Sequence, residues 1–219
     1  MKGVLGNQYG KVGPVVARKF RNENVYSAYQ GNVANPNTEA QQTHRIRFAA
    51  MSQLAHGMAC GAIFGFKTYA KGTNLSPRNW FQKTNWEFVT APTPTSVSTD
   101  FLSLKVSRGG LAPLSSAECN FDIPSKVVVD WTRNGAACQC TPNDNTYIVV
   151  YCPDVKQAII SAPVEVREAR AEVAVPAMWN GLKVYVYGFC RNDGGDYGDN
   201  GIPAGECSDS TFVGQGNIG

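Results

Sequence analysis

The amino-acid sequence predicts an α+β protein, with a β-hairpin arm and helices in the N-terminal part and an antiparallel β-sandwich in the C-terminal part. A strong helix-start signal lies at Asn35–Phe48, within a chain that is otherwise rich in strand-like patterns. The stretch before it is short and punctuated by glycines, and the stretch after Pro92 contains short apolar segments separated by turn residues. We therefore expect a hairpin and helices over residues 1–90, a linker at 91–99 and a sandwich over 100–219.

Residues 1–34 predict the hairpin arm. Val12–Phe20 and Val25–Tyr29 favour strands, and the polar residues between them favour a turn. Apolar and polar residues alternate imperfectly, which is typical of an arm or an edge ribbon. Because an isolated hairpin is only marginally stable in water, we expect this arm to pack against something else.

The helical region opens with a cap. Asn35-Pro36 disfavours helix before it, Thr38 is the expected N-cap, and Gln41 completes a capping box. Glu39 adds a negative charge at the positive end of the helix dipole. An apolar stripe of helical period follows, at Phe48, Met51, Ala55, Met58, Ala62, Phe66 and Tyr69.

Three glycines interrupt this stripe at every fourth position, Gly57, Gly61 and Gly65. Small residues at that spacing allow another backbone to approach closely, but glycines also favour a break into two shorter helices. Both interpretations stay open at this point. Ser76 as N-cap and Pro77 as first helical residue predict a further short helix.

Beyond the linker, short strands recur with turn residues between them. The predicted strands are Phe101–Ser107, Lys126–Thr132, Thr146–Cys152, Lys156–Ser161, Ala169–Val175 and Lys183–Cys190, with a further edge strand at Thr211–Val213. This number of strands over little more than a hundred residues, one of them carrying Trp131, is typical of an immunoglobulin-like or fibronectin-like sandwich.

The two parts of the chain carry opposite charges. Residues 1–90 contain eleven Lys or Arg against three Asp or Glu, whereas residues 91–219 contain nine against fourteen. A basic part suggests an acidic partner, which could be nucleic acid or the acidic part of a neighbouring copy. The sequence shows no nucleic-acid motif, so any such binding is expected to be non-specific. The residues predicted to make these contacts are Lys11, Arg18, Lys19, Arg21, Arg45 and Arg47.

Metal sites and cofactors receive little support. Cys138 and Cys140 are closer together than paired zinc ligands usually are, and no second pair accompanies them. Asp193, Asp196 and Asp199 form a candidate calcium loop, but the pattern does not match an EF-hand. No cofactor is therefore expected.

The sequence also lacks a catalytic constellation. His44 and His56 are the only histidines, and twelve residues of helix place them on different sides. No nucleophile elbow or phosphate-binding loop is present, so we do not expect an enzyme. No secretory signal or membrane span is apparent, and seven cysteines without a signal favour reduced thiols in a protein made in the cytoplasm. Cys152 and Cys190 could face each other across the sandwich, but a protein made in the cytoplasm argues against a bond between them.

Two groups of segments together resemble an uncharacterised family, a domain of unknown function common in Bacteroidota genomes. They are GKVGPVV with NPNTEAQQTHRIRF, and the later run VVVDWTRN, NTYIVVYCP and VPAMWNGLKVYVYGF. The pattern formed by Asn35, Pro36, Thr38, Gln41 and Arg45 is also similar to one in prophage-encoded structural proteins. The resemblance implies an architecture and a virion context, and no activity.

The function expected from these observations is a non-enzymatic structural protein, a self-associating component of a phage-like virion or related particle. Its partners are then other copies of this chain or other particle subunits. The alternative is a binding module in which the sandwich loops, especially Asp193–Gly205, hold a glycan or a protein ligand.

Overall fold

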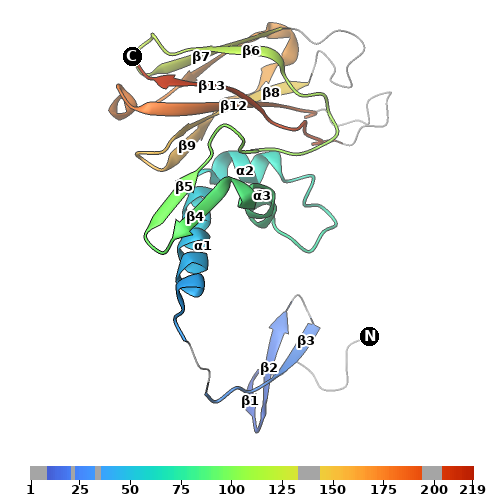
Figure 1. Ribbon diagram of the computed structural model, residues 1–219. Helices are drawn as coiled ribbons and strands as arrows, with labels where there is room; N and C mark the ends of the chain where they lie inside the picture. The colour runs from blue at the N-terminus through green and yellow to red at the C-terminus, as the bar shows by residue number, and fades with distance from the viewer. Residues whose placement is uncertain (1–8, 21–22, 33–35, 133–143, 194–203) are drawn as a thin grey trace. The chain divides into compact units, whose positions relative to one another are not determined.

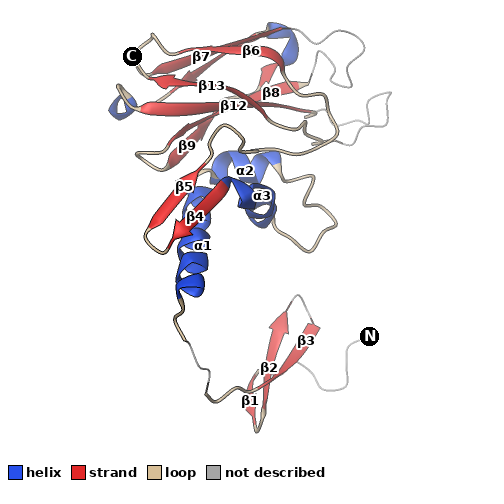
Figure 2. Ribbon diagram, viewed as in Figure 1, coloured by secondary structure: helices blue, strands red, loops and turns tan. Residues whose placement is uncertain are grey.

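The computed structural model describes residues 9–20, 23–32, 36–132, 144–193 and 204–219, and it confirms an α+β protein (Figures 1 and 2). Its internal contacts divide the chain after Thr38 into two compact units, residues 1–38 and residues 39–219. The division does not fall at residues 91–99, where the sequence predicts a linker. Each unit is described by itself.

The first unit contains a three-stranded antiparallel sheet in the order β1-β2-β3, which we call the arm sheet. Its strands are β1 (Gly10–Val12), β2 (Val15–Phe20) and β3 (Glu23–Ala28). The predicted hairpin corresponds to β2 and β3. The segment predicted as one strand from Val12 is in fact two strands, because Gly13 with a φ of 59° and Pro14 turn the chain between them.

The second unit begins with its helices. They are α1 (Glu39–Gly57), α2 (Ala59–Gly65), α3 (Pro77–Asn85) and the short 3-10 helix η1 (Trp86–Phe88). The first starts directly after Thr38, and the third starts at Pro77 with the Ser76 side chain accepting a hydrogen bond from the Asn79 backbone N–H at 3.2 Å. Both helix starts therefore agree with the predictions from local capping signals.

The glycine stripe has both of the effects that the sequence left open. The helical segment breaks after Gly57, where α1 gives way to α2. All three glycines also lie against other parts of the unit: a Cβ atom on Gly57 or Gly65 would meet the backbone carbonyl of Lys156 or Val106. Of the predicted apolar stripe, the five residues from Met51 to Phe66 are fully buried, whereas the Phe48 side chain is exposed.

Residues 89–99 form a hairpin of β4 (Val89–Thr93) and β5 (Ser96–Thr99) in place of an extended linker. The hairpin packs along α1, with the fully buried Val89 at its base. The uncharged composition, rich in Pro, Thr and Ser, suggested an extended linker. Its threonines also favour a paired strand, and the contact with α1 distinguishes the two.

Two antiparallel sheets make up the rest of the second unit. One has three strands in the order β11-β7-β6, and the other has the order β10-β8-β12-β13, with β9 also paired to β8. Their bounds are β6 (Ser115–Asn120), β7 (Lys126–Thr132), β8 (Asn145–Cys152), β9 (Gln157–Ile160), β10 (Val164–Glu165), β11 (Arg170–Ala174), β12 (Lys183–Arg191) and β13 (Thr211–Asn217). Short 3-10 helices at Val166–Glu168 (η2) and Ala177–Trp179 (η3) flank β11.

One predicted strand is absent. Phe101–Ser107 is irregular, although Leu104 and Val106 are buried as a strand pattern would require. Side chains satisfy its backbone instead: the Asn85 Oδ1 accepts from the Lys105 N–H, and the Ser210 Oγ accepts from the Val106 N–H. The segment therefore buries Leu104, Val106 and Ser107 without forming a strand.

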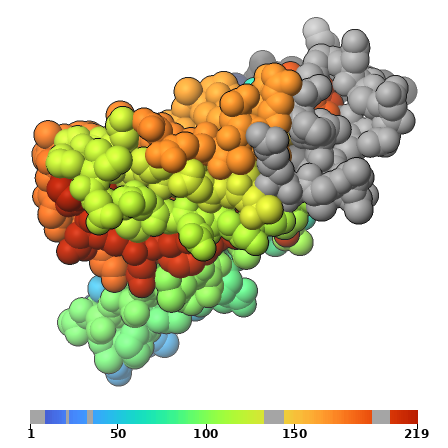
Figure 3. Space-filling view, turned by 90° about the horizontal axis from the view of Figure 1, so that it is seen from above, coloured from blue at the N-terminus to red at the C-terminus, as the bar shows by residue number. Residues whose placement is uncertain are grey.

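The second unit has three layers and two hydrophobic cores. The first core lies between the two sheets and includes Val129, Trp131, Ile148 and Val186. In Figure 3 the outer side of this sandwich shows segments of β6, β7, β11 and β13 side by side. The second core lies on the other face of the five-stranded sheet, where the helices cover it (Figure 1). The helices are thus a third layer of the same unit.

The middle sheet is apolar on both faces because both faces are covered. In β8, Ile148, Val150 and Cys152 belong to the core between the sheets, while Tyr147, Val149 and Tyr151 belong to the core beneath the helices. This explains the uninterrupted apolar run in the sequence.

Candidate functional site

The arm sheet has two chemically different faces. In antiparallel strands, residues directly opposite each other have side chains on the same face, and side chains alternate along each strand. The register of the strands therefore assigns one face, the apolar face, to Val12, Val15, Ala17, Lys19, Asn24, Tyr26 and Ala28. The other face, the cationic face, holds Lys11, Val16, Arg18, Phe20, Glu23, Val25, Ser27 and Tyr29.

Large apolar side chains are exposed on both faces of this sheet. Val12 and Tyr26 on the apolar face are 74% and 49% exposed, and Phe20 and Tyr29 on the cationic face are 61% and 47% exposed. Among the residues that the structure describes, Ala17 is the one buried apolar residue of this unit. A sheet this small forms no core of its own, so its apolar surface is available to a partner.

The six basic residues predicted as contact residues are divided between the two units. They are Lys11, Arg18, Lys19, Arg21, Arg45 and Arg47. The first three lie in the arm sheet, the fourth lies outside the described residues, and the last two lie on α1.

Arg47 has a structural role. Its Nε and Nη2 atoms donate to the backbone carbonyls of Val89 and Trp86, both at 2.6 Å, and its guanidinium lies 4.3 Å from the centroid of the Trp86 ring. The side chain therefore fastens α1 to the start of the β4–β5 hairpin. A charged residue off the apolar stripe gave no signal of this role in the sequence.

Asp193 is held within the protein by several partners. Its Oδ2 accepts hydrogen bonds from the Tyr147 hydroxyl at 2.5 Å and the Asn145 side-chain amide at 2.9 Å, and its Oδ1 lies 3.1 Å from the Arg191 Nε. Burial, with the Asp193 carboxylate beside it, raises the pKa of the Tyr147 phenol. Asp196 and Asp199, the other members of the predicted calcium loop, lie outside the described residues.

The described cysteines are free thiols, of which Cys152, Cys190 and Cys207 are buried and Cys60 is exposed. Burial raises the pKa values of Cys119 and Cys207 to about 12, so both are protonated near neutral pH. Cys152 and Cys190 do not face each other across the sandwich, because both lie in the five-stranded sheet, on β8 and β12. The predicted pair Cys138 and Cys140, like Arg21, lies outside the described residues. Over the described ranges, no three His, Cys, Asp or Glu side chains group as metal ligands would.

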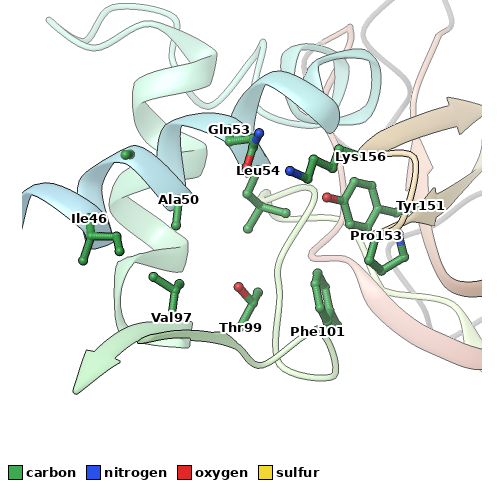
Figure 4. Close-up of a pocket in the computed structure, with 11 residues that line it drawn as sticks. Ile46, Ala50, Gln53, Leu54, Val97, Thr99, Phe101, Tyr151, Pro153 and Lys156 are labelled. Carbon is green, nitrogen blue, oxygen red and sulfur yellow. The ribbon is translucent and has the colours of Figure 1, made fainter. Parts of the chain in front are cut away.

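A groove of about 500 Å³ lies between α1 and β5 (Figure 4). Ile46, Ala50 and Leu54 of α1 face Val97 and Thr99 of β5 across it. Phe101, Tyr151 and Lys156 lie at one end of the groove, and burial raises the pKa of Tyr151 to about 12. The sequence gave no signal of this groove, because residues of three separate segments line it.

A second cavity, of about 570 Å³, lies beside the Arg191–Asp193 ion pair. Lys67, Lys71 and Gly205 also line it. The Arg191 guanidinium lies 4.0 Å from the centroid of the Phe64 ring and is largely buried. The cavity therefore combines a fixed ion pair with two lysines.

The two histidines lie at different places on α1. His44 packs against Trp86 with a ring-centroid distance of 5.6 Å, and His56 lies in the last turn. As predicted, the helix separates them by three turns, so they share no proton or ligand.

In the part of the chain that the structure describes, no helix combines the length and the apolar character that crossing a membrane requires.

Comparison with protein families matches residues 7–202 to DUF6266, a family of unknown function. The match covers both compact units. No curated protein matches the chain.

Proposed function

The chain belongs to the DUF6266 family, whose function is unknown, so we propose its function from its surfaces. We propose that it is a non-enzymatic assembly protein that associates with copies of itself. The observation that carries the proposal is the arm sheet, whose large apolar side chains are exposed in the isolated chain. Burying such side chains against a partner is favourable by about 25 cal/mol for each Å² of apolar surface removed from water.

The charge distribution supports another copy as the partner. Residues 1–38 contain five Lys or Arg and one Glu, while residues 39–219 contain fifteen Lys or Arg and sixteen Asp or Glu. A basic unit and a slightly acidic unit on one chain suit head-to-tail contacts, which close into rings or continue as filaments. We propose that the particle is phage-like, because the Asn35–Arg45 pattern resembles one in prophage-encoded structural proteins.

We also propose that the sandwich is of the immunoglobulin or fibronectin type. If β6, β7, β8, β11, β12 and β13 take the roles of strands A, B, C, E, F and G, the sheets correspond to A-B-E and C-F-G. In this assignment β9 adds an edge strand beside C. The helical layer on the C-F-G face is then an addition to that sandwich.

Light scattering coupled to size-exclusion chromatography tests self-association. We expect the full chain to form oligomers, and a Val12→Asp/Tyr26→Asp variant to shift towards the monomer, because it places two charges on the apolar face. The matched control is Met178→Asp, which changes a side chain that is 69% exposed in the second unit and should leave the mass unchanged. A full chain that is monomeric at all concentrations and salt conditions contradicts the proposal.

The cavity beside Arg191 and Asp193 favours a second candidate function, a ligand-binding module for a glycan or a protein. Its fixed ion pair and its lysines are polar groups of the kind that orient a ligand. A glycan array and a thermal-shift assay with and without calcium test this candidate. Negative results in both assays eliminate it.

A further inference from the structure

We propose that the cationic face of the arm sheet binds single-stranded nucleic acid, with Lys11 and Arg18 contacting phosphates and Phe20 and Tyr29 stacking on bases. This inference does not rest on self-association, because it uses the face of the sheet opposite to Val12 and Tyr26.

The register brings cations and aromatic rings onto one surface. Lys11 pairs with Val16 on the neighbouring strand, and Arg18 lies two residues further along that strand, on the same face. The Lys11 Nζ lies 3.4 Å from the centroid of the Tyr29 ring, which confirms that β1 and the end of β3 present these side chains together. Phe20 follows Arg18 on the same face, at the end of β2.

Charge complementarity identifies the occupant as a polyanion. On this face Lys11 and Arg18 stand against one carboxylate, that of Glu23, and residues 1–38 together have a net charge of +4, from five Lys or Arg and one Glu. Among the described residues, Lys11 and Arg18 take part in no ion pair, whereas Lys126, Arg167, Arg170 and Arg191 of the second unit each pair with a carboxylate. Lys11 and Arg18 are therefore not paired with a carboxylate of any residue that the structure describes.

The aromatic rings favour a single strand over other polyanions. Proteins that bind single strands without sequence preference combine a positive surface with aromatic side chains, and each stacked base contributes about 1–3 kcal/mol. Phe20 and Tyr29 are about half exposed or more, so each presents part of a ring to a base. Glu23 faces Phe20 across the strands, which limits the phosphate contacts to the part of the face near Lys11 and Arg18.

Fluorescence anisotropy with a labelled 20-nucleotide oligothymidine and the full chain tests this proposal. We expect salt-dependent binding, and a Lys11→Gln/Arg18→Gln variant should weaken it about tenfold and lower the slope of log affinity against log salt by about 1.4, since two phosphate contacts are lost. Phe20→Ala should also weaken binding about tenfold, and Phe20→Tyr should restore it. The control variant, Lys105→Gln/Lys183→Gln, removes two exposed charges from the second unit and should bind as the unmodified chain does.

Three outcomes overturn the proposal. One is the absence of binding at low salt, and another is binding that the Lys105→Gln/Lys183→Gln variant loses while the arm variants retain it. The third is equal affinity for vesicles containing phosphatidylserine, which assigns the face to an anionic membrane surface. Light scattering and circular dichroism of each variant separate loss of binding from loss of assembly or of folding.

Discussion

At the scale of single residues, Arg47 shows how far a side chain's role can differ from its residue type. Lysine or arginine off an apolar stripe usually faces solvent or a partner, and Arg47 was predicted from the sequence to contact a partner. A guanidinium has five N–H donors in a fixed plane, so one side chain can satisfy two carbonyls and still stack on a ring. In the folded chain it binds the carbonyl groups of Trp86 in η1 and of Val89 at the start of β4.

We expect Arg47→Met to lower the free energy of unfolding by about 2 kcal/mol, because two carbonyls lose charged donors. Arg47→Lys should cost about half as much, since an ammonium cannot reproduce the planar pair of hydrogen bonds. Urea denaturation measures both changes. Lys71→Met, at an exposed position, serves as the control and should change the value by less than about 0.5 kcal/mol. An Arg47→Met variant as stable as this control contradicts the structural role.

At the scale of elements, local signals predicted helix starts and the most regular strands. The Ser76-Pro77 cap gave the start of α3, and the alternating segment Lys126–Thr132 gave β7 with the same bounds. The sequence did not predict β6, because Ser115–Asn120 has little apolar character. This segment forms a strand because it pairs with β7. The segment Phe101–Ser107 has the apolar pattern of a strand but no strand beside it. Pairing partners are a property of the whole chain, so a local pattern cannot supply them.

The same limit applied to the candidate sites. The basic residues of the arm were evident from composition, but their division between two faces of a sheet depends on the register of β1 with β2. The groove between α1 and β5 depends on a hairpin that the sequence led us to interpret as a linker.

The close approach of helix and core at Gly65 gives a prediction at this scale. Gly65→Ala should destabilise the protein by about 2 kcal/mol, although alanine favours a helix by about 1 kcal/mol, because the new methyl group meets the Val106 carbonyl and Ser107. Gly110→Ala is the matched control, since its Cβ would meet only the end of a Glu206 side chain at 3.7 Å. Thermal unfolding compares the two variants. Equal stability of both would show that the contact at Gly65 relaxes without cost.

At the scale of the whole molecule, the helices and the sandwich share one sheet. The sequence predicted two regions joined at residues 91–99, because the composition changes there. The structure instead places α1, α2 and α3 over the face of the five-stranded sheet that carries Tyr147, Val149 and Tyr187. Strand patterns alone predict a sandwich of two layers. The helices are recognised as a third layer only because a second core lies between them and the five-stranded sheet.

This arrangement predicts that residues 100–219 do not fold by themselves. Without the helices, the aromatic face of β8 and β12 would be exposed to water, so the fragment should aggregate or bind the dye ANS. A chain of residues 36–219, which keeps the three layers, should unfold in one cooperative transition. Circular dichroism and ANS fluorescence compare the two. A well-folded 100–219 fragment with no dye binding would restore the division at residues 91–99.

The alternation along β8 has a consequence for how its register is maintained. In a strand with one wet face, slipping by one position exchanges apolar for polar side chains, and the penalty for exposing them prevents the slip. Here both faces are dry, so a slip would exchange one set of apolar groups for another, and water would play no part in opposing it. Side-chain size opposes the slip instead, because the close-packed positions of Ile148 and Val150 would have to accept the larger rings of Tyr147 and Tyr151. The Tyr147 hydroxyl would also lose its hydrogen bond to Asp193. In this strand, shape rather than polarity distinguishes the correct alignment from the incorrect one.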